Sequence, residues 1–84
     1  MYYVYLIQSI KYPEKKYIGY TRNLKERLKT HNCAGFKHTT RYRPWKVVMY
    51  LAFEDLDRAV SFEKYLKSGS GYSFSQKRFW QTPN

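Results

Sequence analysis

The spacing of apolar residues along this chain changes at several points, and each change marks an element of secondary structure. Residues 2–7 are apolar or aromatic at every position, which is typical of a strand covered on both faces. Strand character resumes at residues 17–21 after a polar, proline-containing segment, so the start of the chain predicts a β-hairpin with a long loop. A near-continuous apolar run at residues 45–53 predicts a third strand.

A capping pair predicts the first helix. Asn23 followed by Glu26 has the form of a capping box, which starts a helix that runs to about Asn32. At about 100° per residue, one stripe of this helix carries two leucines, an arginine and a histidine: Leu24, Arg27, Leu28 and His31. Because the leucines must be buried, we expect the arginine and the histidine to be drawn against the body of the protein.

The second half of the chain predicts two further helices. Asp55 or Asp57 caps the first, which reaches about residue 67 and ends in a Ser-Gly-Ser-Gly segment. A second capping box, Ser73 with Gln76, opens a short terminal helix. We expect that helix to present two basic and two aromatic side chains: Lys77, Arg78, Phe79 and Trp80.

Together these elements predict a single α+β domain that spans residues 1–84. The expected order is ββαβαα, with a basic loop at residues 34–43, and the three strands form an antiparallel sheet flanked by helices. A chain of 84 residues has room for one modest core and no second domain. No apolar run approaches the ~20 residues needed to cross a bilayer, and the N-terminus lacks the basic start of a signal peptide, so we expect a cytoplasmic protein.

The charge of the chain points to a polyanionic partner. Sixteen Lys and Arg against six Asp and Glu give a formal net charge of +10, which attracts nucleic acid. No basic amphipathic helix with a broad apolar face is present, so we expect nucleic acid in preference to a membrane surface. The single cysteine, Cys33, excludes an internal disulfide and a cysteine-based zinc site.

The segment Tyr17-Ile18-Gly19 and the helix after it combine three groups that handle phosphate. Arg27 comes ten residues after Tyr17, and His31 follows one helical turn later. Arginine is a fixed cationic fork for phosphate oxygens, whereas tyrosine and histidine carry protons. On the residues alone, packing of the tyrosine ring in the core explains Tyr17 equally well.

An acidic residue occupies an apolar position in the second long helix. Four residues define the apolar stripe of this helix: Leu56, Ala59, Val60 and Leu66. Glu63 projects close to the centre of that stripe, and a buried carboxylate is costly unless it is paired, hydrogen-bonded or bound to a metal. Two interpretations stay open: an ion pair with a Lys or Arg of another element, or a ligand for Mg²⁺, which typically takes one or two protein carboxylates plus substrate phosphates.

These residues resemble the GIY-YIG nuclease superfamily over residues 2–67. The first motif corresponds to Val4-Tyr5-Leu6 and the second to Tyr17-Ile18-Gly19. Three single residues also match the family's pattern: Arg27, His31 and Glu63. Residues 43–48 and 66–71 are similar to the small single-domain bacterial members described as endonucleases.

The resemblance implies a role for each matching residue. Tyr17 would activate the attacking water as a general base or hold it through its hydroxyl, and Tyr5 would orient that water or contact the scissile phosphate. Arg27 would bind the phosphate and offset charge that grows in the transition state. His31 would hydrogen-bond the tyrosine or carry its proton, and Glu63 would hold one Mg²⁺ (or Mn²⁺) on the side of the leaving oxygen.

The chain departs from the family's pattern at two tyrosines. Tyr3 replaces the glycine that names the first motif. Tyr20 follows the second motif directly, where its bulk would narrow the site. Some relatives also use a polar ligand late in the chain, for which Ser75 and Gln76 are the candidates.

The leading functional hypothesis is a Mg²⁺-dependent endonuclease that hydrolyses phosphodiester bonds in DNA. The alternative is a non-catalytic nucleic-acid-binding module for DNA or RNA, and a third, weaker one is a protein-interaction subunit. Branched, nicked or single-stranded DNA is favoured, because tyrosines and Trp80 would stack on exposed bases. We expect salt-dependent phosphate contacts from six basic residues: Lys25, Lys29, Lys37, Arg41, Arg43 and Lys46.

Overall fold

The computed structural model of the protein describes residues 1–33 and 37–80, apart from the side chain of Lys37. Its elements follow the chain in the order β1 (Tyr2–Ser9), β2 (Lys16–Thr21), α1 (Leu24–Asn32), α2 (Lys37–Thr40), β3 (Trp45–Phe53), α3 (Leu56–Leu66) and α4 (Gly69–Arg78). The expected α+β class with a three-stranded antiparallel sheet is confirmed. Within the described ranges, no helix has the length and apolar character needed to cross a bilayer.

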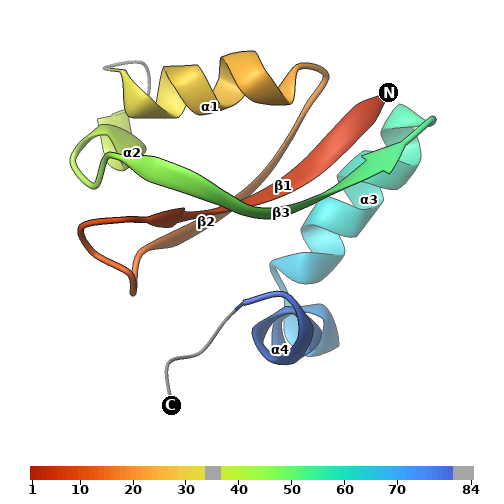
Figure 1. Cartoon of the computed structure of the whole chain (residues 1–84). Coiled ribbons are helices and arrows are strands. Elements are labelled where there is room, and N and C mark those ends of the chain that lie inside the picture. Colours follow the sequence, from red (N-terminus) through yellow and green to blue (C-terminus); the bar gives the residue numbers. More distant parts are fainter. Residues whose placement is uncertain (34–36, 81–84) are drawn as a thin grey trace.

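β1 is the central strand of the sheet, which has the order β2-β1-β3. Residues 4–7 are each no more than 1% exposed, as predicted for a strand covered on both faces. In the register of the sheet, Tyr5 lies opposite Gly19 of β2 and opposite Tyr50 of β3. Figure 1 shows α1 and α2 on one side of the sheet and α3 and α4 on the other.

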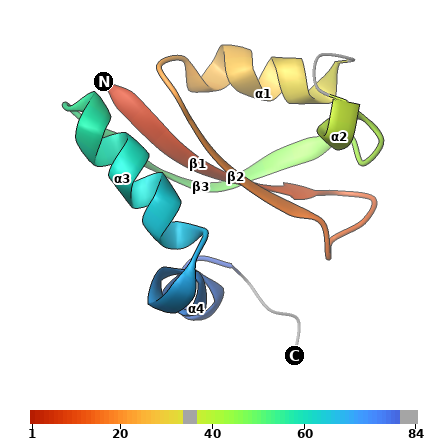
Figure 2. The ribbon, with the colours of Figure 1, turned by 180° about the vertical axis from the view of Figure 1, so that it is seen from behind.

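Alternation of side chains along β1 divides the core into two clusters. Val4 and Leu6 point to the α3 and α4 side, in a cluster completed by four buried residues: Ile18, Ala59, Leu66 and Trp80. Tyr5 and Ile7 point to the α1 side, where they pack with Trp45 and with the leucines of α1. The reverse view in Figure 2 shows the same separation of α1 from α3 by the sheet. β1 and β2 lie between the two clusters, so their residues can contact side chains from both faces of the sheet.

α3 confirms the predicted burial of its glutamate. Of the two candidate caps, Asp55 serves, because its side chain accepts a hydrogen bond from the backbone N–H of Asp57 at 3.1 Å. The buried residues of the helix are Ala59, Glu63 and Leu66. Leu56, however, is 41% exposed, so the apolar stripe starts one turn later than predicted.

The last helix begins earlier than predicted. α4 starts at Gly69, with Ser68 as its N-cap, so most of the Ser-Gly-Ser-Gly segment lies inside the helix and the capping box expected at Ser73 is wrong. Gly71 makes this possible, because a Cβ there would overlap the carbonyl oxygen of Tyr65 at the end of α3. Gly71 thus allows the two helices to pack closely.

Trp80 follows α4 and is 5% exposed in the core cluster on the α3 side. Its indole ring also receives the Lys16 ammonium group at 5.1 Å from the ring centroid. The expectation that Trp80 is presented for stacking on exposed bases is therefore wrong.

Gly71→Ala should destabilise the fold, because the new methyl group would be driven into the backbone of α3. Overpacking of this kind costs about 1–3 kcal/mol, which urea denaturation followed by circular dichroism can measure. Ser70→Ala, at the neighbouring exposed position, should change the free energy of unfolding by about 0.5 kcal/mol or less. Equal stability of Gly71→Ala and wild type would contradict the close packing of α3 and α4.

Candidate active site

α1 begins where the sequence predicted and turns its basic stripe toward the sheet. The Asn23 side chain accepts a hydrogen bond from the Glu26 backbone N–H at 3.1 Å, which is the N-cap half of the predicted capping box. The Glu26 carboxylate accepts from the Asn23 side-chain amide at 3.2 Å, whereas the Asn23 backbone N–H donates to Thr21 Oγ1 at 3.1 Å. The leucines of the stripe pack against the cluster around Tyr5. His31 is 1% exposed and Arg27 is half-buried, so both lie against the body of the protein as expected.

A buried hydrogen bond joins β1 to α1. The Tyr5 hydroxyl lies 2.9 Å from His31 Nε2, and His31 Nδ1 lies 3.1 Å from Thr39 Oγ1. Burial lowers the pKa of His31 to about 4, with further contributions from Arg27 and His38, so the imidazole is neutral near pH 7. We therefore assign the Tyr5 hydroxyl as the donor to Nε2 and the Nδ1–H group as the donor to Thr39.

The Tyr5 hydroxyl is held in its protonated form. Burial raises the pKa of Tyr5 to about 12, and the neighbouring Tyr17 and Glu63 add to the increase. Arg27 lowers the pKa of Tyr5 through its positive charge and through a hydrogen bond to the phenol. Near pH 7, Tyr5 is thus a hydrogen-bond donor, and Arg27 favours its phenolate form.

Gly19 allows two tyrosine rings to meet over β2. A Cβ at Gly19 would lie 2.6 Å from the Tyr5 hydroxyl oxygen and 3.0 Å from Tyr17 Cε1, closer than side chains tolerate. With glycine there, the Tyr17 ring centroid lies 6.2 Å from that of Tyr5 and 5.0 Å from that of His31. The glycine of the second motif therefore leaves room for the Tyr5 and Tyr17 side chains to approach each other.

The two tyrosines that depart from the family's pattern lie away from this cluster. Tyr20 is 40% exposed and pairs with Val4 in the sheet, so it faces the side opposite to Gly19. The expected narrowing of the site by Tyr20 is wrong for this reason. Tyr3 lies toward α1, where its ring contacts Tyr50 at a centroid distance of 5.9 Å.

Glu63 approaches from α3, on the other side of the sheet. It is 9% exposed, and its Oε2 lies 2.7 Å from the Lys67 ammonium nitrogen. That nitrogen lies 5.6 Å from the centroid of the Tyr17 ring, so the ion pair is beside Tyr17 at the β2 edge. The partner of Glu63 thus comes from one turn later on the same segment, not from another element as the ion-pair interpretation proposed.

Glu63 also has the donor chemistry for a divalent cation. Among the side chains that the structure describes, no group of three or more His, Cys, Asp or Glu residues comes together to bind a metal. Mg²⁺ needs fewer protein ligands than that, because it keeps several waters and takes one or two carboxylates plus substrate phosphates. A single buried glutamate fits such an ion once Lys67 moves aside.

Hollows lie on either side of the cluster. Tyr17 and Gln76 border one of about 410 Å³, which Lys67 also lines. Arg27 borders another, of about 470 Å³. Of the two late polar candidates, Gln76 therefore faces the same space as Tyr17, whereas Ser75 is fully buried and donates its hydroxyl hydrogen bond within α4.

Three residues of this region were not predicted: Lys67, His38 and Thr39. Lys67 had a usable signal, because it follows Glu63 by four residues on a helix. The other two lie in α2, which the sequence predicted as loop and which has no apolar periodicity. The His38 ring lies 5.7 Å from Tyr17, and Thr39 is 2% exposed beneath His31.

The basic residues predicted to contact DNA are exposed wherever their side chains are described. They lie on α1, in the turn before β3 and at the start of β3: Lys25, Lys29, Arg41, Arg43 and Lys46. The side chain of Lys37 lies outside the described part of the chain. Their exposure leaves cationic groups accessible to phosphates, and contact with DNA stays a prediction.

Comparison with known proteins identifies the class to which this arrangement belongs. A family model described as the GIY-YIG catalytic domain matches residues 1–76. A UPF0213 protein of Clostridium perfringens (strain 13 / Type A) is 40% identical over 68 residues, which cover 80% of this chain and 71% of that protein. A UPF0213 protein of Streptococcus pyogenes serotype M3 is 36% identical over 66 residues, which cover 77% and 70%.

A longer protein is also similar. The structure-specific endonuclease subunit SLX1 homolog of Giardia intestinalis is 34% identical over 65 residues, which cover 73% of this chain but 18% of that protein. The family match over residues 1–76 and the bacterial relatives agree with the fold. This chain belongs to the GIY-YIG nuclease family.

Acidification should destabilise the fold through His31. The unfolded chain binds a proton at this imidazole near pH 6.5, whereas the folded protein does so only near pH 4. Between these values the unfolded state holds more protons, so stability falls as the pH drops. The full effect is about 3 kcal/mol of unfolding free energy, which urea denaturation across this pH window would measure.

The matched variants are His31→Gln and His38→Gln. This part of the pH dependence should be lost in His31→Gln, although that variant is less stable at every pH. It should persist in His38→Gln, because His38 is exposed. An unchanged slope in His31→Gln would show that another group is responsible.

Proposed function

We propose that this chain is a metal-dependent endonuclease that hydrolyses phosphodiester bonds in DNA. The observation that carries the proposal is one connected cluster in a member of the GIY-YIG family: Tyr5 and Tyr17 meet over Gly19, and the Tyr5 hydroxyl contacts both His31 and Arg27. This cluster combines a fixed cation for phosphate with two phenols and a neutral imidazole for proton transfer. A buried Tyr–His pair of this kind has no evident use in a domain that binds nucleic acid by charge alone.

Arg27 is the group we propose to bind the scissile phosphate. Its half-buried guanidinium is permanently charged and lies against Tyr5, where a phosphate oxygen would exclude water. Negative charge grows on the phosphate oxygens as water attacks, so a positioned cation stabilises the transition state more than the ground state.

Tyr5 and His31 form the proton path that we propose. Tyr17 would hold the attacking water through its hydroxyl, because its ring packs against both residues of the hydrogen-bonded pair. As Tyr5 takes the proton of that water, its own proton would pass to His31 Nε2, which already accepts the hydrogen bond. In this path His31 therefore acts as a base together with Tyr5, and it does not take a proton from Tyr17.

In the free protein, proton transfer from Tyr5 to His31 is unfavourable. Burial raises the pKa of Tyr5 to about 12 and lowers that of His31 to about 4, so the proton stays on the phenol. Exclusion of water by bound DNA would strengthen the pull of Arg27 on the Tyr5 proton. Neutralisation of the Glu63 charge would remove one contribution that raises the pKa of Tyr5. Through both effects, substrate binding would make it easier for Tyr5 to give up its proton to His31.

Glu63 is the residue we propose to hold one Mg²⁺ or Mn²⁺, with Gln76 as a candidate second ligand. When bound, such an ion would supply positive charge next to the leaving oxygen. Lys67 must release Glu63 for this to occur, and its side chain is 46% exposed and free to turn toward solvent or a substrate phosphate.

DNA that contains a branch is the substrate class we propose. The Giardia relative is named as a subunit of a structure-specific endonuclease. The formal net charge of +10 and the exposed cations of α1 and β3 favour phosphate contacts that do not read sequence. DNA repair in the cytoplasm is the setting we propose for this activity.

One observation also favours the alternative, a nucleic-acid-binding module without catalysis. Lys67 neutralises Glu63, and Tyr5 stays protonated, as both would in a site that no longer performs chemistry. Binding through surface charge requires neither group to change. A cleavage assay decides between the two functions.

Cleavage of branched and linear DNA should require Mg²⁺ and the proposed residues. Tyr5→Phe should lower kcat by about 10²–10⁴-fold through loss of the proton acceptor, and Arg27→Ala by about 10²–10³-fold through loss of charge stabilisation. Glu63→Gln should have the same effect as chelation of the metal. Arg58→Ala, which removes an exposed arginine of α3, is the matched control for Arg27→Ala.

Each outcome of this assay selects one function. Cleavage that survives both chelation and Glu63→Gln would rule out the metal-dependent mechanism. DNA binding by wild type without cleavage of either substrate would favour the binding module. Circular dichroism of each variant separates loss of chemistry from loss of fold.

The pH dependence of kcat/KM provides a separate check on the base. The rate should be nearly independent of pH from about pH 6 to about pH 9, because Tyr5, with a pKa of about 12, stays protonated throughout this range and is the form that passes its proton to His31. No inflection near pH 6.5 should be seen, since the pKa of His31 is about 4 and its imidazole is neutral throughout. An inflection there that disappears in His31→Gln would contradict the assignment of a neutral imidazole.

A further inference from the structure

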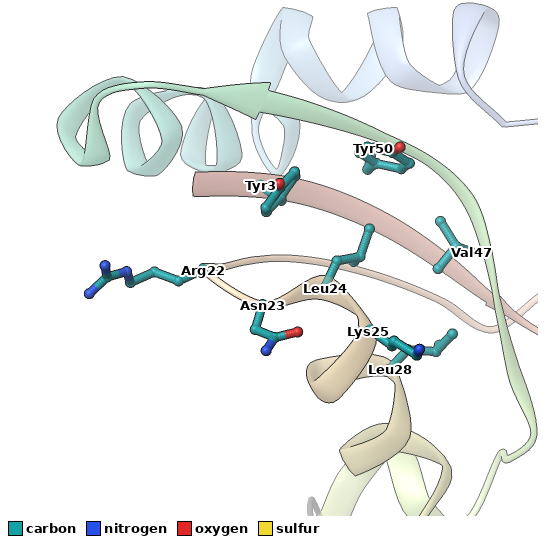
Figure 3. A pocket seen from close by; sticks show the side chains of 8 residues that line it. All are labelled: Tyr3, Arg22, Asn23, Leu24, Lys25, Leu28, Val47 and Tyr50. Carbon is teal, nitrogen blue, oxygen red and sulfur yellow. The ribbon is translucent and has the colours of Figure 1, made fainter. Parts of the chain in front are cut away.

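A separate hollow of about 510 Å³ lies on the α1 side of the sheet, on the flank of α1 that faces β3. Figure 3 shows the residues that line it: Tyr3, Arg22, Asn23, Leu24, Lys25, Leu28, Val47 and Tyr50. Arg27 lines the hollow on the opposite flank, together with Thr21 of β2. α1 therefore separates this space from the cluster of catalytic candidates.

Aromatic and aliphatic side chains form the wall of this hollow. The rings of Tyr3 and Tyr50 pack edge-to-face, with centroids 5.9 Å apart and planes at 68°. Tyr50 is 54% exposed, and Figure 3 shows Leu24 reaching from α1 toward the two rings. The result is an apolar surface with an exposed π-face, suited to a flat aromatic ligand.

Positive charge lies at the rim of the hollow. Lys25 is exposed and supplies this charge, whereas the Arg22 guanidinium extends away from the two rings (Figure 3) and lies over the Tyr2 ring at 5.6 Å. None of the described residues that line the hollow is acidic. An aromatic ligand that carries a negative group would therefore match both the wall and the rim.

We propose that this hollow binds one unpaired nucleotide of a DNA strand, with its base against Tyr50 and its phosphate at Lys25. The faces of a base in a duplex are covered by its neighbours, so an aromatic wall selects bases that are unstacked. An apolar peptide would use the rings but leave the Lys25 ammonium group unmatched. The inference rests on the proposed function and specifies the part of the substrate that the domain recognises.

The position of the hollow explains how a branch would be recognised. Lys25 and Arg27 are two residues apart on α1, which places them on different flanks of the helix. A strand held in the hollow would cross α1 to reach Arg27. Unpaired DNA near the cleaved bond would thus be favoured without any reading of base identity.

The test uses the whole chain, with chelator present, and a flap DNA that carries 2-aminopurine in its unpaired arm. Wild type should quench the 2-aminopurine fluorescence as the base stacks on Tyr50. Tyr50→Leu keeps an apolar side chain, and it should abolish the quenching and raise Kd for the flap by about five-fold or more. The Kd of Tyr50→Leu for a duplex of the same length should differ from that of wild type by less than about two-fold.

Two further variants sharpen the result. Lys25→Gln should weaken flap binding and reduce its salt dependence, because one phosphate contact is lost. Tyr65→Leu removes a 44% exposed tyrosine from α3 and should leave both the quenching and Kd unchanged. Quenching that survives Tyr50→Leu, or equal weakening of flap and duplex, would overturn the nucleotide site. A 2-aminopurine RNA arm that is quenched through Tyr50 would support a nucleotide site that accepts either sugar.

The outcome is separable from that of the cleavage assay. If wild type fails to cleave DNA with Mg²⁺ but quenches through Tyr50, the nuclease function is wrong and the nucleotide site stands. If wild type cleaves the flap and Tyr50→Leu binds it normally, the nuclease function stands and the nucleotide site is wrong.

Discussion

The close approach of two tyrosine rings over Gly19 is the constraint on which the candidate site depends. β1 and β2 place Tyr5 and Gly19 opposite each other, and the missing side chain leaves room for the phenol to reach His31. Any other residue at this position would push Tyr5 or Tyr17 away. The placement of the two tyrosines is therefore set by sheet register, which is a rigid feature of the fold, and α1 adds Arg27 and His31 to them.

Features that depend on nearby residues were predictable from the sequence. Asn23 and Glu26 are three residues apart, so the N-cap hydrogen bond between them and the start of α1 follow from local pattern. Periodicity also placed His31 and Glu63 on buried faces, because the apolar neighbours of each define the stripe. In these cases the information lies within one or two helical turns.

Features that depend on contacts between distant segments were not predictable in the same way. Gly71 was interpreted as a helix end because glycine usually ends helices, but its contact with Tyr65 uses glycine for close packing inside α4. The sequence also left open which tyrosine His31 contacts, since the two partners of the observed hydrogen bond are 26 residues apart. Burial is also the largest cause that raises the pKa of Tyr5 and lowers that of His31, and composition does not reveal it.

The ion pair between Glu63 and Lys67 has a consequence for folding. A buried carboxylate without a partner destabilises a protein strongly, and metalloproteins that rely on the ion for that neutralisation lose their structure with the ion. Here the lysine one turn later supplies the positive charge from within the chain. Neutralisation of Glu63 therefore does not require a bound cation, so under the proposed function the supply of metal in the cell would govern the activity of the domain and not its abundance.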